Sequence, residues 1–596
     1  MTRSRPTIDG FLLSLQPGVP ARVRGWPRPV EVGESAVWFH GYLADPSSLR
    51  TDLKLDHAAS FATIVEAGWR RWRADVTERI LGEFAAVLVT GPVAVVLGDR
   101  MGLRPLYWSP HADGIAVSTD LGVLVRETAA WRRLDEEYLA DLFGAGQHLG
   151  GRTPYRDVMR LQAGEFAVWE AGRLRVRGGW RPRESPVAGS FDEHQDLLRT
   201  TVRRVVSQAK PPDGTAAVEL SGGLDSSTLL AVLCGLAPVH ALSFVYPGNP
   251  QSDETPWIRA ALTATPASWH PIDASQHGYF TAGPELGIFV PAPSRRILNW
   301  ALRAAEDAAA AAVGATAVLT GEGGDAVFLA GLLPWYLADL LRTGRLKRLV
   351  RESNSWTAHT GVRRPSTFWI RRAGIDGWRW WRSGQSLTID PPKPIGVLAP
   401  WLERAYVADN ALGSRARTTT GIRAQSVHGQ AVLENILRSA DSVRSIRLSA
   451  SGGPEFRHPF LAPPLVDLAL ITPWRVGVDP RIDRAVQRYA FRGMVGETTL
   501  RRRSKPNVDE AIFRGFERNP IWREYLLDSP EIVKRGYADA REWTTAVGRA
   551  TVGQTGGVPQ FHTAIQIEVW LRHLRHVGAP DLLAATTVDT VDTVVR

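Results

Sequence analysis

The sequence predicts an α/β protein with two domains, a strand-rich domain in residues 1–185 and a parallel-sheet domain in residues 191–596. Three observations support this prediction. The chain has 596 residues, which is too long for one compact core, because domains usually contain about 100–200 residues. Strand-like segments dominate the first third of the chain, whereas strands and helices alternate from Thr215 onward. A proline-rich polar stretch, 181–190, separates the two patterns and is interpreted as a linker.

Residues 1–185 are expected to form a mixed domain of sheet and helix. The candidate strands are rich in β-branched and aromatic residues and are separated by turn sequences such as Thr90-Gly91-Pro92. Two stretches with helical spacing, 58–73 and 136–143, interrupt them. The strand segments are expected at Ser35–Tyr42, Phe84–Gly98 (a hairpin), Ile115–Ser118 and Gly164–Trp169.

Residues 191–596 are expected to contain a doubly wound parallel sheet, followed by a mainly helical region beyond Ala326. A helix over 192–209 opens this part, and apolar strands then alternate with helices. Such alternation is typical of a parallel sheet that is covered on both faces. The strands are expected at 216–220, 239–245 and 317–319, and the helices at 226–235, 255–263 and 294–312.

Composition narrows the class of protein further. Hydrophobic residues make up 44% of the chain and charged residues 22%, which excludes a disordered, collagen-like or fibrous protein. Because Cys234 is the single cysteine, an intramolecular disulfide or a cysteine-based zinc site is excluded, and we expect a small buried hydrophobe there. No apolar run could span a bilayer and no secretory signal is visible, so we expect a cytoplasmic protein without an integral membrane segment.

A loop rich in glycine and serine, Ser221–Ser227, lies between a predicted strand and a predicted helix. Its two glycines let the backbone approach a ligand closely, and the N-terminus of the following helix favours an anion. Asp225 would repel a bare phosphate but is useful if Mg²⁺ lies between the two. The spacing of a Walker loop does not occur in the chain. We therefore predict a phosphate site of another type, with a simple capping turn as the structural alternative.

A second motif, Thr320–Asp325, follows another predicted strand. In a doubly wound sheet, loops at the carboxyl ends of the strands meet at one edge. The carboxylates of Asp225 and Asp325 can then share Mg²⁺, while Glu322 faces the ligand. The structural alternative is an acidic glycine turn.

These motifs carry a resemblance to known proteins. Ser221–Ser227 resembles the PP-loop of the N-type ATP pyrophosphatases, which split ATP between the α and β phosphates. With Thr320–Asp325, it makes the chain similar to the asparagine synthetase superfamily over nearly its whole length. The resemblance implies an Ntn glutaminase-like αββα domain in 1–185 and a PP-loop synthetase domain with helical insertions in 191–596. Further matching segments are Phe39–Tyr42, Leu81–Ala85, Gly98–Tyr107, Glu455–Leu461 and Arg502–Lys505.

Several positions depart from the family pattern. Members that hydrolyse glutamine carry cysteine directly after the initiator methionine, whereas this chain has Thr2 there. His40 stands where the family has an asparagine of the oxyanion type. The resemblance therefore implies an inactive glutaminase-like scaffold domain and a nitrogen nucleophile that arrives as an amine of the substrate. His458 and Ala462 also depart from the pattern, and the sequence offers no physical account of either.

Superfamily members that use a substrate amine include β-lactam synthetase, carbapenam synthetase and the lasso peptide macrolactam synthetases, or lasso cyclases. The segment from Arg351 to Arg382 contains seven arginines, two acids and five tryptophans, a composition typical of peptide recognition. This favours a lasso cyclase, although the same tryptophans could fill a helical core. The alternatives are a glutamine-independent small-molecule amide or β-lactam synthetase, an asparagine synthetase-like enzyme and a non-catalytic scaffold. The net charge of +10 does not choose among them.

The resemblance also assigns roles to residues. Glu322 is expected to orient or deprotonate the amine, and Lys505 to stabilise charge on the reacting phosphorus and the departing pyrophosphate. The expected partners are a precursor peptide, a leader-binding protein and a leader protease, with no nucleic acid. The cofactors are ATP and Mg²⁺, the latter on Asp225 and Asp325, and the residues expected at ATP are Leu220, Ser221, Gly222, Gly223, Asp225, Ser226, Ser227, Phe244, Thr320 and Gly321.

Overall fold

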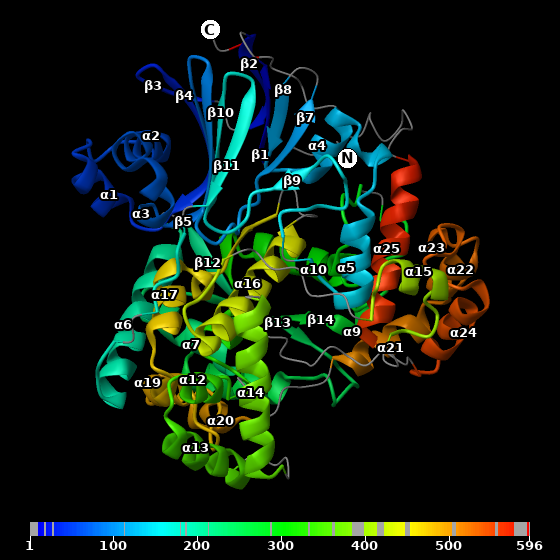
Figure 1. Ribbon diagram of the computed structural model, residues 1–596. Helices are drawn as coiled ribbons and strands as arrows, with labels where there is room; N and C mark the ends of the chain where they lie inside the picture. Colours follow the sequence, from blue (N-terminus) through cyan, green and yellow to red (C-terminus); the bar gives the residue numbers. More distant parts are fainter. Residues whose placement is uncertain are drawn as a thin grey trace.

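The structure is a computed structural model in which two antiparallel sheets lie next to a parallel sheet surrounded by helices (Figure 1). The predicted α/β class, with a glutaminase-like αββα part and a doubly wound parallel sheet, is confirmed. The structure describes residues 10–16, 19–26, 29–111, 114–148, 150–178, 180–184, 187–212, 214–286, 289–331, 334–359, 364–383, 398–413, 422–447, 453–503, 508–554, 558–576 and 593–594.

The N-terminal part is a sandwich of two six-stranded antiparallel sheets. Alternate residues along the strands point into the space between the sheets, where Trp38, Val87 and Val117 are fully buried. The first sheet has the order β17-β2-β1-β8-β7-β9, with bounds Thr593–Val594, Val19–Trp26, Gly10–Gln16, Gly114–Ser118, Tyr107–His111 and Met159–Arg160. The second has the order β11-β10-β6-β5-β4-β3, with bounds Arg173–Gly178, Glu165–Glu170, Val93–Gly98, Gly82–Thr90, Ser35–Leu43 and Val30–Val32.

Helices cover the outer faces of this sandwich. The outer face of the second sheet packs on α2, and that of the first packs on α4 and α5. The expected helices at 58–73 and 136–143 are confirmed as α2 and α5, but the expectation of only two helices is wrong. The additional helices have eight residues or fewer, which is too short for a clear hydrophobic period. The five helices are α1 Pro46–Leu53, α2 Phe61–Trp72, α3 Val76–Arg79, α4 Leu121–Thr128 and α5 Glu136–Ala145.

The parallel sheet has the order β14-β13-β12-β15-β16. Its central strand β12 is buried on both faces, since Ala216 and Val218 belong to one core and Ala217 to another. The chain adds strands on one side of β12 and then on the other, so the strand order reverses between β12 and β15. Strands β14 and β16 were not predicted, because one contains a proline and the other has three residues. The bounds are β12 Thr215–Glu219, β13 His240–Val245, β14 Ser268–Asp273, β15 Ala315–Leu319 and β16 Glu455–Arg457.

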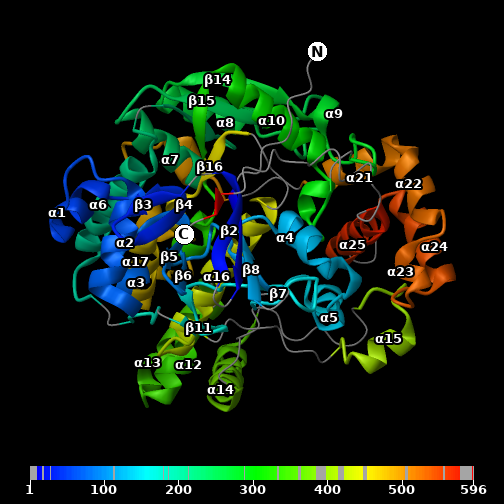
Figure 2. The same ribbon diagram turned by 90° about the horizontal axis from the view of Figure 1, so that it is seen from above.

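Helices α6, α7, α8 and α10 flank this sheet, and the chain beyond Ala326 is mainly helical, as expected. The helix predicted over 294–312 is shorter, because Arg295–Ile297 form a separate 3-10 turn. Views from two directions show α21–α25 on a different side from α12–α14 (Figures 1 and 2). The bounds of the flanking helices are α6 Phe191–Ala209, α7 Leu224–Cys234, α8 Thr255–Ala264 and α10 Trp300–Ala312, and the short helix α9 spans Ala274–His277.

The remaining helices, α11–α25, follow β15 in the chain. The last five share a core with α4 and α5 that contains the fully buried Trp522, Trp543 and Trp570. Among the described residues, no helix is both long and apolar enough to cross a membrane. The bounds are α11 Gly324–Val327, α12 Tyr336–Arg342, α13 Leu346–His359, α14 Ser366–Ser383, α15 Arg404–Asp409, α16 Val427–Arg447, α17 Pro463–Ile471, α18 Trp474–Gly477, α19 Ala485–Ala490, α20 Glu497–Arg501, α21 Asp509–Arg518, α22 Pro520–Leu527, α23 Glu531–Lys534, α24 Ala540–Ala550 and α25 Val558–His576.

Candidate functional site

The first glycine-rich loop connects β12 to α7 and is held by its own side chains. The Ser226 hydroxyl accepts a hydrogen bond of 3.2 Å from the backbone N–H of Ser221, and the Ser221 hydroxyl accepts one of 3.3 Å from Gly223. Gly222 has a φ of +68°, and a Cβ there would lie 2.5 Å from the backbone of α8. A tight loop therefore requires glycine at this position and presents its backbone at the start of α7.

The second loop follows β15, the neighbour of β12, and touches the first loop directly. A Cβ on Gly324 would lie 2.6 Å from the carboxyl carbon of Asp225, and one on Gly321 would lie 3.3 Å from the Asp225 Cβ. Gly323 adopts a φ of +86°. The two motifs thus meet at the point where the strand order reverses, which is where ligands bind in open α/β sheets.

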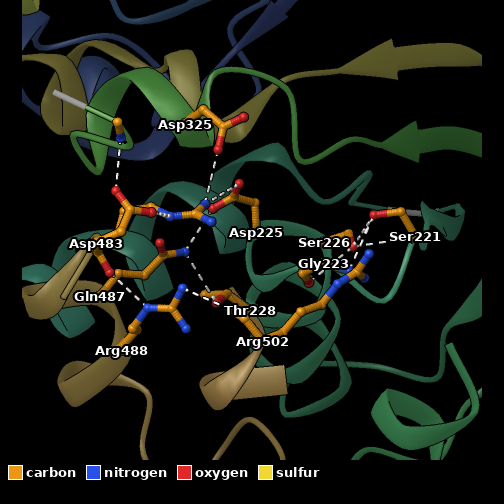
Figure 3. Close-up of polar contacts among 12 residues, drawn as sticks. Ser221, Gly223, Asp225, Ser226, Thr228, Asp325, Asp483, Gln487, Arg488 and Arg502 are labelled. Carbon is orange, nitrogen blue, oxygen red and sulfur yellow. Dashed lines mark hydrogen bonds and ion pairs between the residues drawn. The ribbon is translucent and has the colours of Figure 1, made fainter. Parts of the chain in front are cut away.

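The carboxylates of the two motifs converge on one arginine. Asp225 Oδ2 and Asp325 Oδ1 lie 2.9 Å and 3.0 Å from the same Nη1 atom of Arg484. Gln487 Nε2 donates a hydrogen bond of 2.9 Å to the other oxygen of Asp225. Figure 3 shows Asp225 and Asp325 pointing toward one another from the first turns of α7 and α11. Sequence positions 225 and 325 are therefore close enough to act on one ligand.

Arg484 is a charged residue with only 9% of its surface exposed. Burial opposes its charge, but Asp225, Asp325 and Asp483 outweigh the burial and raise the pKa of the guanidinium. Arg484 precedes α19 with a φ of +55°, a backbone conformation that is costly for an arginine. Strained backbone conformations cluster at active sites and ligand-binding sites. The strained and charged Arg484 between two carboxylates therefore indicates a binding or catalytic site.

The donor set fits a hard cation. Carboxylate oxygens are preferred by Mg²⁺, which usually keeps few protein ligands and takes others from substrate phosphates. Within the described residues, no group of three or more His, Cys, Asp or Glu side chains could hold a metal. Asp225 and Asp325 would therefore supply two ligands, and a triphosphate would have to supply others.

A cavity of about 1330 Å³ opens beside the two loops. Its wall includes Ser221, Gly223 and Glu322 from the loops and Trp356 from α13. Much of the opposite wall comes from residues 477–503 and is strongly basic. The arginines that line the cavity are Arg295, Arg481, Arg484, Arg488, Arg492, Arg501, Arg502 and Arg503, and the acids are Glu254, Glu322, Asp479, Asp483 and Glu497.

The other predicted site residues lie in different environments. The side chain of Leu220 is buried in the core, so only its backbone can approach a ligand, and Thr320 is also buried. Phe244, at the end of β13, is half-buried beneath the guanidinium of Arg303, whose centre lies 5.4 Å from the ring. Glu322 is exposed at the cavity. Lys505 and Thr2 lie outside the described residues.

Arg484 and Gln487 are candidate site residues that sequence reasoning missed, whereas Arg502 opens the segment Arg502–Lys505 that resembles the family pattern. Arg502 Nη2 lies 2.7 Å from Glu254 Oε1, and its guanidinium lies over the Trp257 ring. The available signal was the density of arginines between 481 and 503, which is higher than elsewhere in the chain's C-terminal part. Nothing in this run of arginines indicates which one reaches Asp225, because Arg484 lies 259 positions away from it in the chain.

The structure divides the tryptophans of the segment 351–382 into two groups. Trp356 and Trp369 are buried with 7% exposure, whereas Trp378 and Trp381 are 53% and 77% exposed. Of the five, only Trp356 lines the cavity. The interpretation as a core therefore holds for Trp356 and Trp369, whereas the interpretation as a recognition surface remains a prediction.

Cys234 is at the end of α7 and is half-buried, so the expectation of full burial is wrong. Its Sγ lies 3.9 Å from the carbonyl oxygen of Pro266, and partial burial raises the pKa of the thiol. The helix end is covered on one side only. A raised pKa disfavours the thiolate, so no nucleophilic role is indicated.

Comparison with known proteins agrees with both halves of the fold. A family model described as asparagine synthase matches residues 193–572, and one described as a glutamine amidotransferase domain matches residues 27–180. The chain is 21% identical over 263 residues to glutamine-hydrolyzing asparagine synthetase 3 of Bacillus subtilis (strain 168), covering 40% of this chain and 42% of that protein. It is 28% identical over 183 residues to carboxyethyl-arginine beta-lactam-synthase of Streptomyces clavuligerus, covering 30% and 33%.

These matches span less than half the length of either curated relative. Among solved structures, the chain is similar to glutamine phosphoribosylpyrophosphate amidotransferase from B. subtilis, complexed with ADP and GMP. That similarity has a TM-score of 0.21 at 11% identity and covers 53% of this chain and 76% of the other.

Proposed function

Because the chain belongs to the asparagine synthase family, we propose that it is an AMP-forming ligase that closes an amide ring within one substrate. The family comprises ATP-dependent ligases that form carbon–nitrogen bonds. The specific proposal is a lasso peptide cyclase. It would join an Asp or Glu side-chain carboxylate of a precursor peptide to the peptide's N-terminal amine and release AMP and pyrophosphate.

The single observation that supports this best is the convergence of Asp225 and Asp325 on one point between two glycine loops. Asp225 is half-buried and Asp325 is exposed, and two carboxylates at one point repel each other unless cations lie between them. Arg484 supplies one fixed positive charge, and Mg²⁺ on the same carboxylates would neutralise phosphate oxygens. A non-catalytic scaffold would have no use for this charge arrangement.

The residues of the chain then have separate tasks. The backbone at Ser221 and Gly223 holds the phosphates at the start of α7, where the helix dipole favours an anion. The substrate carboxylate attacks the α-phosphorus, and the bond from that phosphorus to the β-phosphate oxygen breaks. Arg484 and Lys505 stabilise the departing pyrophosphate. Glu322, at the cavity wall, orients the amine and accepts its proton as the amide forms and AMP leaves.

Two observations favour an amine that belongs to the substrate. The only cysteine of the sequence, Cys234, lies in α7, outside the glutaminase-like part. His40, which replaces the family's asparagine, contacts Arg104 Nη1 at 2.9 Å through Nε2, and Arg104 forms an ion pair with Glu455. We therefore propose that residues 1–185 act as an inactive scaffold. The tethered amine then benefits from a high effective molarity.

The size and the lining of the cavity support a peptide substrate. Small-ligand sites usually enclose about 300–1,000 Å³, whereas this cavity measures about 1330 Å³. Its arginines and Trp356 are of the types that dominate peptide recognition. The second candidate is a small-molecule amide or β-lactam synthetase, which the 28% identity to a beta-lactam synthase favours. A precursor peptide, a leader-binding protein and a leader protease are the proposed partners, and the cytoplasm is the proposed location.

Mass spectrometry tests the proposal. The protein is incubated with MgATP and synthetic candidate peptides that carry one internal Asp or Glu and a free N-terminus. Loss of one water from the peptide, with one AMP formed for each ring, is the expected result. AMP formation with a small β-amino acid but with none of the peptides would favour the second candidate. Glutamate production from glutamine would overturn the proposal that 1–185 is inactive.

The Asp225→Asn variant tests the role of the Asp225 carboxylate. It preserves the shape of the side chain and removes the charge, so AMP formation should fall to background. The Glu322→Gln variant should form the acyl-adenylate, as measured by exchange of pyrophosphate into ATP, but should close the ring slowly. Exchange and ring closure at the wild-type rate in both variants would refute the assigned roles.

A further inference from the structure

We propose that His458 is a positioning residue through which the N-terminal sandwich holds the second phosphate loop in place. The inference rests on the proposed nucleotide site. It concerns contacts between β5, the end of β16 and the loop after β15. It also provides a physical reason for a residue that departs from the family pattern.

At one end of this connection, His458 holds Thr320. The His458 Nδ1 atom lies 2.7 Å from Thr320 Oγ1, and the two residues are 5% and 3% exposed. The same hydroxyl oxygen accepts a hydrogen bond of 3.3 Å from the backbone N–H of Glu322. A hydroxyl can accept one hydrogen bond and donate another, so Thr320 can hold the Glu322 N–H while its proton is donated to His458 Nδ1. The imidazole thus fixes the rotamer of Thr320, and Thr320 fixes the backbone of Glu322.

At the other end, the N-terminal sandwich holds His458. The backbone N–H of His458 donates a hydrogen bond of 2.8 Å to Glu83 Oε1, on β5. Glu83 is 3% exposed, and the hydroxyl of Tyr42 also donates to this oxygen at 3.3 Å. A buried carboxylate with two donors is rigid, since each lost partner would leave a desolvated charge. Glu83, on the second sheet of the sandwich, thereby holds the residue that directly follows β16.

A second contact fixes the same strand end. The Arg104 side chain donates a hydrogen bond of 3.1 Å from Nε to the Glu83 carbonyl and forms an ion pair with Glu455. Arg457, two residues along β16, hydrogen-bonds Glu455 at 2.8 Å, and its guanidinium centre lies 4.1 Å from the Tyr42 ring centre. The Thr320 N–H bonds to the Arg457 carbonyl at 3.0 Å. Strand β16 is therefore clamped between the sandwich and the loop.

The loop after β15 needs such support because a small displacement would disturb the site. Gly324 and Gly321 lie against Asp225, so a shift of the loop changes the distance between the two carboxylates. Misplacing a reacting group by about 1 Å can reduce a rate by about a hundredfold. His458 does not line the cavity and so acts through Thr320 and Glu322 rather than on the ligand.

The experiment compares two substitutions of one residue. His458→Asn retains an acceptor close to the position of Nδ1, whereas His458→Leu removes it. Phe456→Leu is the control, because Phe456 is on the same strand and packs into the core on the opposite sheet face. Full-length proteins are compared for binding of α,β-methylene-ATP with Mg²⁺, for kcat and KM of ATP in AMP formation, and for thermal midpoint.

We expect His458→Leu to lower kcat/KM for ATP by about tenfold, because it removes one hydrogen bond that supports the phosphate loop. The kcat/KM for ATP of both His458→Asn and Phe456→Leu should lie within about threefold of the wild-type value. Thr320→Val should cause a similar loss, and the double variant should lose no more than either single variant, because both act on one contact. The thermal midpoints of His458→Leu and Phe456→Leu should be alike.

Additive losses in the double variant, or equal activity in His458→Leu and the control, would overturn the inference. Failure of His458→Asn to recover, with a wild-type thermal midpoint, would also do so. If His458→Leu does not fold, Thr320→Val and Thr320→Ser replace it, with recovery expected only in the serine variant. A wild-type protein that does not bind the ATP analogue refutes the proposed function instead. If the wild type binds the analogue but closes no ring, weaker analogue binding in His458→Leu than in Phe456→Leu supports the inference, and equal binding overturns it.

Discussion

Replacing Gly324 with alanine should disable the site without unfolding the protein. An added Cβ would lie 2.6 Å from the Asp225 carboxyl carbon and 2.8 Å from its Oδ1. Ordinary carbon contacts begin near about 3.5 Å, so one side must move by roughly 1 Å. Asp225 is held by Arg484 and Gln487, and it cannot move without losing these contacts. A displacement of this size predicts a fall in kcat for AMP formation of about a hundredfold.

The assay is AMP formation under saturating MgATP, with the thermal midpoint measured in parallel. Gly324 is the first residue of α11, and alanine is a better helix former than glycine, so the midpoint should change little. The matched control is Gly548→Ala in α24, where an added Cβ meets nothing within 4 Å. A Gly324→Ala enzyme with activity within twofold of this control would refute the argument that the two loops touch.

Further predictions concern charge, pH and burial. Arg484→Gln should slow the departure of pyrophosphate and lower the rate of AMP formation by at least about tenfold. An unchanged rate would show that Arg484 has no role in the reaction. Burial lowers the pKa of His428 from 6.5 to about 4, so the unfolded chain binds more protons between these values and stability falls as pH decreases from 6.5 to 4. His428→Gln should flatten that part of the stability curve in urea unfolding, and an equal slope would contradict the assignment. Trp369→Ala should cost about 3–5 kcal/mol and Trp381→Ala less than about 0.5 kcal/mol, since they are 7% and 77% exposed.

Much of the fold could be predicted from local patterns. The apolar strands β12, β13 and β15 and the hairpin of β5 and β6 were expected close to where they occur. Strand β16 was missed because it has three residues, two of them charged, and it forms only by pairing with β15. Its position depends on tertiary contacts that no short window of sequence contains.

The candidate site divides in the same way. Glycine spacing and the position after a strand were enough to bring Asp225 and Asp325 to one edge, because the rules for parallel sheets place both loops there. The contacts of Arg484 and His458 could not be predicted, because they involve residues 259 and 138 positions away in the chain. The boundary at 185–191 and the role of Lys505 remain predictions.

The contacts across the linker have a consequence for dissecting the protein. Arg100 pairs with Asp467 at 2.6 Å, Arg160 pairs with Asp441 at 3.1 Å, and Arg444 donates to the Met101 carbonyl at 3.0 Å. All three arginines are largely shielded from water. A fragment that begins at residue 191 would lose Arg100 from Asp467, Arg160 from Asp441 and the Met101 carbonyl from Arg444. The halves should therefore be soluble and active only when produced together, as one polypeptide or as a co-expressed pair.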